Sequence, residues 1–75
     1  MSPVDAVDVA QREVATCYET YVQAALDLDR SIAPGVSRDR FWVQLEAFLT
    51  ARSAWLAASA RSAAVYAAYG AGKEA

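Results

Sequence analysis

The residue types that carry most enzymatic chemistry are nearly absent from this 75-residue chain. It contains no histidine and a single cysteine, Cys17. Without histidine there is no imidazole base to activate a serine or cysteine nucleophile, and one cysteine cannot form an intrachain disulfide or hold zinc unaided. We therefore expect no enzymatic activity, no catalytic residue, no bound metal and no cofactor. Cys17 itself is interpreted as a small buried hydrophobic residue.

The acidic residues do not form a catalytic pair either. Carboxylate chemistry needs two acids that converge in one pocket, and Asp27 and Asp29 are the nearest such pair in the sequence. Residues two apart on a helix point to different sides, so these two are interpreted as solvated charges near a helix end. The net charge of −2 gives no overall attraction to nucleic acid or to an anionic membrane surface. Neither is expected as a partner.

The most apolar segment, residues 53–72, is long enough to cross a bilayer but is not expected to do so. Arg61 lies near its middle, and its apolar residues are mostly alanine, which gains little free energy in lipid. The start of the chain has neither the basic region nor the apolar region of a signal peptide. We expect a soluble, cytoplasmic protein.

The sequence predicts two helices, and these must position any functional side chains. Apolar side chains at spacings of three and four predict a first helix from about residue 3 to residue 30. Ser2 is a suitable N-cap, Pro3 fits the first helical position, and Asp5 lies where the helix dipole favours a negative charge. No glycine or proline interrupts the segment after Pro3.

A turn is predicted over residues 31–37, where a proline stands beside Gly35. Ser37 is then the natural N-cap of a second helix over about residues 38–69. The glycine that opens residues 70–75 is expected to end this helix, and those last residues are expected to fray.

Two long helices joined by a short turn define the expected fold, a single all-α domain over residues 1–75 built as an antiparallel two-helix hairpin. A turn centred near Gly35 brings residues level when their numbers add to about 69. Tyr21 should then lie level with Phe48, and Val14 with Trp55.

The second helix carries too little charge for a helix with an exposed face. Only three of the residues from 41 to 69 are charged, whereas residues 4–30 contain eight charges. One partner helix covers only part of such a surface, and a chain below about 80 residues usually needs a disulfide, a metal or oligomerisation to close its core. We therefore expect two hairpins to pack as a homodimeric four-helix bundle with coiled-coil-like contacts. A different protein in place of the second hairpin, or an alanine-rich face simply left in water, are the alternatives.

The residues expected at the interface combine large rings, arginines and a second apolar stripe of the first helix: Val22, Leu26, Arg38, Arg40, Phe41, Trp42, Phe48, Arg52, Trp55 and Tyr66. The large apolar residues of the second helix are expected to face the first helix and to remain partly uncovered. Its small residues, Ala58 among them, are expected on the outer side, and Arg61 with them.

Three of the arginines have more than one interpretation. Arg38 and Arg40 lie level with acidic residues at the end of the first helix, so ion pairs across the turn are expected. A docking patch with the neighbouring aromatic residues is the alternative. Arg52 falls within the apolar stripe and is expected to set the register of the helices, by stacking on an aromatic ring or by pairing with Glu19 or Glu13, across the hairpin or from another subunit. Extension into solvent and ligand binding are the alternatives for Arg52.

These features favour a non-enzymatic protein–protein interaction module, a self-associating hairpin that acts as an adaptor or structural subunit. Two other functions stay open. One is a small inhibitor or antitoxin-like protein whose apolar face is completed by a target protein, and the other is a helical accessory subunit of an enzyme. The sequence does not identify the partner.

Overall fold

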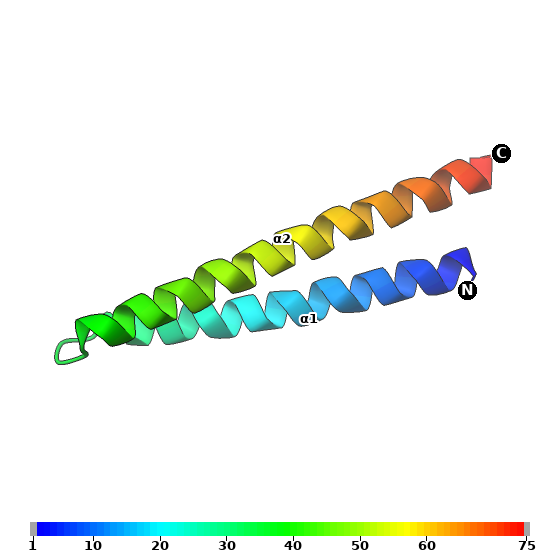
Figure 1. Cartoon of the computed structure of the whole chain (residues 1–75). Coiled ribbons are helices and arrows are strands. Elements are labelled where there is room, and N and C mark those ends of the chain that lie inside the picture. The colour runs from blue at the N-terminus through cyan, green and yellow to red at the C-terminus, as the bar shows by residue number, and fades with distance from the viewer. Residues whose placement is uncertain (1, 75) are drawn as a thin grey trace.

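The computed structural model describes residues 2–74, and the side chains of residues 2–71. Helix α1 spans Pro3–Arg30 and helix α2 spans Arg38–Glu74. Figure 1 shows the two helices antiparallel, with the loop at one end and both termini at the other. The hairpin measures 60 × 15 × 13 Å, and no strand occurs in the described part of the chain. The predicted all-α hairpin is confirmed.

Side chains fix both ends of α1. The Ser2 hydroxyl accepts a hydrogen bond from the Asp5 amide at 3.3 Å, and the Asp5 carboxylate accepts one from the Ser2 amide at 3.4 Å. This reciprocal capping box satisfies two amides that the helix leaves without partners. At the other end, the Ser31 amide donates to the carbonyl oxygens of Asp27 and Leu28, and its hydroxyl donates to the latter at 2.6 Å. The predicted N-cap is confirmed.

The loop turns where the sequence predicts it. Gly35 has φ of 89°, in the left-handed region that glycine adopts without steric cost. The Val36 amide donates to the Ala33 carbonyl at 3.3 Å. The Ser37 hydroxyl then accepts a hydrogen bond from the Arg40 amide at 3.2 Å and caps the first turn of α2.

The predicted end of the second helix at residue 69 is wrong, because α2 continues through Gly70 to Glu74. A glycine ends a helix when it takes up a left-handed conformation, and Gly70 does not have a positive φ. Within a helix a glycine costs only about 1 kcal/mol relative to alanine, which the flanking helical residues tolerate. Ala75, the last residue of the tail expected to fray, lies outside the described residues.

Burial recurs along both helices at alternating spacings of three and four residues, the heptad pattern of a coiled coil. We call these positions the seam: Val7, Ala10, Val14, Cys17, Tyr21, Ala24 and Leu28 of α1, and Phe41, Gln44, Phe48, Ala51, Trp55, Ala58, Ser62 and Val65 of α2. Along α2 the bulky positions of the seam alternate with smaller ones for most of its length. Cys17 is half-buried there, with its thiol free.

Aromatic rings fill the middle of the seam. The Tyr21 ring lies 5.3 Å from that of Phe48 and 5.3 Å from that of Trp55, nearly parallel to the latter at 27°. Tyr18 meets the Trp55 ring edge-on at 5.4 Å. Between the rings, alanine lets the two backbones approach, and Ala58 is only 1% exposed. Rings packed between close backbones are what holds the hairpin together.

The ring contacts between the helices agree with the predicted register in part. Tyr21 contacts Phe48 as expected, and Trp55, expected to lie level with Val14, packs its ring on Tyr18 and Tyr21. Side chains of a helix lean toward its own N-terminus. In an antiparallel pair, two residues that touch therefore lie farther along their chains than two residues that are merely level.

Candidate interaction surface

The hairpin buries few of its side chains. Among the described residues the buried hydrophobic side chains are only Ala10, Ala51 and Ala58, and no large side chain is fully buried. Eleven large hydrophobic residues in the described part of the chain are more than a third exposed. A pair of helices can shield only one stripe of each, so the rest of the apolar surface stays in contact with water.

Six of these exposed residues lie on one side of the hairpin, which together with the half-buried Leu45 we call the apolar face: Tyr18, Val22, Trp42, Leu49, Leu56 and Tyr66. Each of them directly follows a seam residue in the sequence. One step along a helix turns a side chain by about 100°, and in antiparallel helices this step leads to the same side of the pair. A hydrogen bond from the side-chain amide of Gln11 to the Tyr66 hydroxyl joins the two helices on this side.

Residues that directly precede the seam lie on the other side, which we call the polar face. There the Arg61 guanidinium donates to the Glu13 carboxylate and forms an ion pair between the helices. Asp27 also lies on this face, where it accepts a hydrogen bond from Gln23 at 3.1 Å and pairs with Arg30 at 3.8 Å. The two sides of the hairpin therefore differ: large apolar side chains gather on one, and the other carries the ion pair between the helices, while α2 contributes Val43, Ala47 and Ala54 to it.

The apolar face contains a shallow groove along α2. Its lining consists of Trp42, Leu45, Glu46, Leu49, Thr50 and Ser53. Trp42 is 53% exposed and its ring meets that of Phe41 edge-on at 5.6 Å, so the outermost aromatic ring of the face is held by a seam residue. The groove is open and mostly apolar, and the polar residues in its lining are Glu46, Thr50 and Ser53.

The ten residues predicted for the interface separate into three groups. Phe41, Phe48 and Trp55 are half-buried in the seam; Val22, Arg52, Trp42 and Tyr66 lie exposed on the apolar face; Leu26, Arg38 and Arg40 are exposed elsewhere. The three seam rings therefore serve the hairpin first, and the apolar face is carried by their neighbours in the sequence.

The predicted faces of the second helix are partly wrong. Ala58, expected on the outer side, is the most buried of the core residues, whereas Leu49 and Leu56, expected to face α1, are 47% and 48% exposed. The seam alternates a large residue with a small one because small residues let the backbones approach. A prediction that places only the largest residues against α1 therefore gives α2 the wrong rotation about its axis.

The arginines also differ from prediction. Arg38 and Arg40 are exposed and form no ion pair across the turn with any described residue, and Asp27 pairs with Arg30 of its own helix. Arg52 is exposed and has no ion pair within the described part of the hairpin. The glutamate that joins the helices, Glu13, pairs with Arg61. Arg61 is the residue that the sequence analysis missed, and the correct heptad register is the signal that would have found it.

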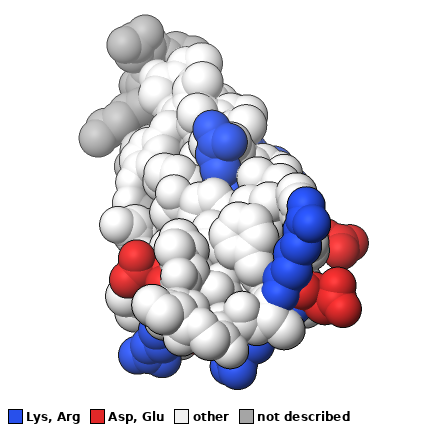
Figure 2. All heavy atoms as spheres, turned by 90° about the vertical axis from the view of Figure 1, so that its left-hand side faces the viewer, with Lys and Arg blue, Asp and Glu red and all other residues white. Residues whose placement is uncertain are grey.

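Charges of both signs surround the loop end. Figure 2 shows basic and acidic side chains at its rim and an uncharged centre between them. In the part of the chain that the structure describes, no three potential ligands among Cys, Asp and Glu converge on a possible metal position. No described helix combines the length and the apolar character needed to cross a membrane.

The fold is thus an antiparallel helical hairpin with an apolar face beside its seam. No protein-family model, no curated protein and no solved structure matches this chain.

Proposed function

We propose that this protein is a non-enzymatic protein–protein interaction module that self-associates through its apolar face into a four-helix bundle and serves as an adaptor or structural subunit. The observation that carries the proposal is the contrast between a core of small alanines and the six large hydrophobic residues exposed on one side. An exposed patch of contiguous apolar side chains on a small protein marks an interaction site.

The size of the apolar face agrees with a dimer. The exposed fractions of its six large residues leave on the order of 600 Å2 of side-chain surface per chain. Two such faces in contact bury roughly 1,200 Å2, which is the lower limit of specific, stable interfaces. At about 25 cal/mol per Å2 of apolar area, this burial provides free energy that offsets the entropy lost when two chains associate.

Sedimentation of the purified chain tests this proposal. We expect a species of twice the 8.1 kDa mass of one chain at micromolar concentration, with helical circular dichroism. Leu49→Ser together with Leu56→Ser should shift it toward the monomer, whereas Val43→Ser, on an equally exposed part of α2, should not. A helical monomer at high concentration would refute self-association. A poorly folded monomer would favour the alternative in which a target protein, as for an inhibitor or antitoxin-like chain, completes the face.

A further inference from the structure

Along the exposed surface of α2, charged residues and large apolar residues stand at equal distances on either side of Leu49. Glu46 precedes Leu49 by three residues and Arg52 follows it by three, so opposite charges stand at equal distances on either side. Trp42 precedes it by seven residues and Leu56 follows it by seven, so two large apolar residues stand one heptad away. Glu46 and Arg52 are the only charged residues between Phe41 and Arg61.

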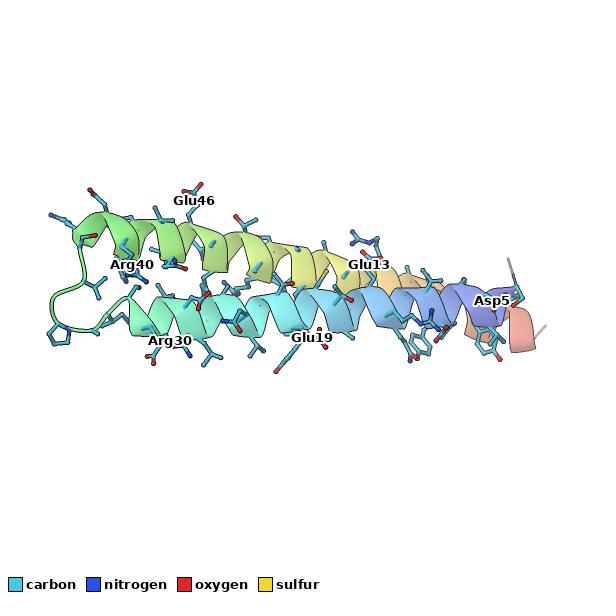
Figure 3. All side chains as sticks on the ribbon, turned by 90° about the horizontal axis from the view of Figure 1, so that it is seen from below. Asp5, Glu13, Glu19, Arg30, Arg40 and Glu46 are labelled. Atoms are coloured by element: carbon cyan, nitrogen blue, oxygen red, sulfur yellow. The ribbon has the colours of Figure 1, made fainter. Side chains whose placement is uncertain are left out.

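These two charges have no ion-pair partner among the described side chains of the hairpin. Glu46 is exposed, lines the groove beside Trp42 and Leu49, and points away from α1 (Figure 3). Arg52 directly follows the buried Ala51, which places it on the apolar face. Neither forms an ion pair with a described residue. A lone pair of opposite charges in an apolar surface fits a partner that presents the same two charges in reverse order.

A second copy of the same helix presents that order. Residues of a helix are spaced 1.5 Å apart along its axis. If a two-fold axis at Leu49 relates two antiparallel copies, a residue that precedes Leu49 in one copy lies level with the residue that follows Leu49 by the same number in the other. Glu46 of each copy then lies level with Arg52 of the other, on the opposite flank of the contact, so that these two long side chains pair across it. Trp42 lies level with Leu56 of the other copy. Leu49 meets its own counterpart at the axis.

We infer that two copies of the chain pack α2 against α2, antiparallel, about a two-fold axis at Leu49, with Glu46 of each copy paired to Arg52 of the other. This inference rests on the proposed self-association and specifies its geometry. A parallel arrangement would bring each charge level with a like charge, which is unfavourable. An antiparallel arrangement with the axis displaced along α2 leaves Glu46 or Arg52 level with an uncharged residue or with a like charge.

Affinity and geometry come from different residues in this arrangement. Burial of Trp42, Leu49 and Leu56 provides the attraction, since exposed ion pairs contribute little to stability in water. The charges select the orientation, because every other arrangement leaves them unpaired in the apolar contact or facing a like charge.

Charge reversal tests the axis. Glu46→Arg and Arg52→Glu, each alone, put like charges level at two places in the dimer, so each is expected to raise the Kd of self-association about tenfold or more. The double variant restores both pairs and should return the Kd to within about threefold of the parent. An equimolar mixture of the two single variants should form the mixed dimer. Glu19→Arg makes the same change on an exposed glutamate of α1 that points away from α2, and should leave the Kd unchanged (Figure 3).

A disulfide at the axis provides a second readout. In a Cys17→Ser background, Leu49→Cys is expected to oxidise to a covalent dimer, because the axis places this position against its own counterpart within disulfide range. Val43→Cys, also exposed on α2, should form no disulfide-linked dimer under the same oxidation. Circular dichroism confirms that each variant is helical.

The outcomes separate the two proposals. A dimer whose Kd is unaffected by the single reversals, or that is not restored by the double reversal, overturns the axis at Leu49 and leaves self-association standing. Oxidation of Val43→Cys in preference to Leu49→Cys also overturns the axis. A parent chain that remains monomeric overturns both.

Discussion

Arg61 of α2 pairs with Glu13 of α1, and this is the ion pair that joins the two helices within the described part of the chain. Both residues directly precede seam residues, so the pair closes the polar face over the seam. The side chains are 58% and 41% exposed, and water therefore screens their attraction. The pair connects the two helices far from the loop that joins them.

Arg61→Ala is expected to lower the free energy of unfolding by no more than about 1 kcal/mol, because the pair is largely exposed. Glu13→Ala should cost about the same, and the double variant should cost no more than either single variant, since both remove one interaction. Arg12→Ala, which breaks a pair with Asp8 inside α1, controls for loss of an arginine. Urea unfolding at a fixed chain concentration measures these values. Additive losses in the double variant would argue against direct coupling.

The two tryptophans are expected to have different roles. Trp55 stacks on Tyr21 and lies edge-on to Tyr18 within the seam, so Trp55→Ala should lower the free energy of unfolding by about 2–4 kcal/mol through the cavity that it leaves. Trp42 is 53% exposed on the apolar face, so Trp42→Ala should mainly weaken self-association and leave helicity close to that of the parent. Circular dichroism and sedimentation, run on both variants, separate these effects. Loss of helicity in Trp42→Ala with intact Trp55→Ala would reverse the assignment.

The sequence predicts the hairpin, its loop and its caps because each depends on local chemistry. Gly35 beside a proline requires a turn, and Ser2 and Ser37 each supply an acceptor for an amide that a helix start leaves free. The charge count of α2 also points to an uncovered surface without any knowledge of the packing.

The rotation of α2 is harder to predict, because several stripes of this helix are apolar. Phe48 and Leu49 are adjacent and both large, yet the first lies in the seam and the second on the apolar face. What decides between them is how closely the backbones can approach, and this depends on Ala51 and Ala58 lying opposite α1. Side-chain size alone carries no information about that approach. The cross-helix partner of Glu13 is misassigned for the same reason.

Enlarging the most buried alanine tests this account of the seam. Ala58 is 1% exposed, so Ala58→Leu has no space for the added side chain and should push the helices apart, with a loss of about 1–3 kcal/mol in the free energy of unfolding. Ala57→Leu makes the same change at the adjacent, exposed position and should be close to neutral. Thermal unfolding compares the two at equal chain concentration. Equal stability of the two variants would show that α2 does not approach α1 through Ala58.

Gly35 and Gly70 should respond to alanine in opposite directions. Gly35 has φ of 89°, where an alanine is strained although no atom would lie within 4 Å of the added methyl, so Gly35→Ala should destabilise the hairpin by about 1 kcal/mol. Gly70 is helical and its surroundings are equally open, so Gly70→Ala should stabilise α2 by up to about 1 kcal/mol through its higher helix propensity. Because neither methyl makes a contact, the difference isolates backbone conformation from packing. Thermal unfolding by circular dichroism gives both signs in one experiment. Destabilisation by Gly70→Ala would mean that the helix ends at this glycine after all.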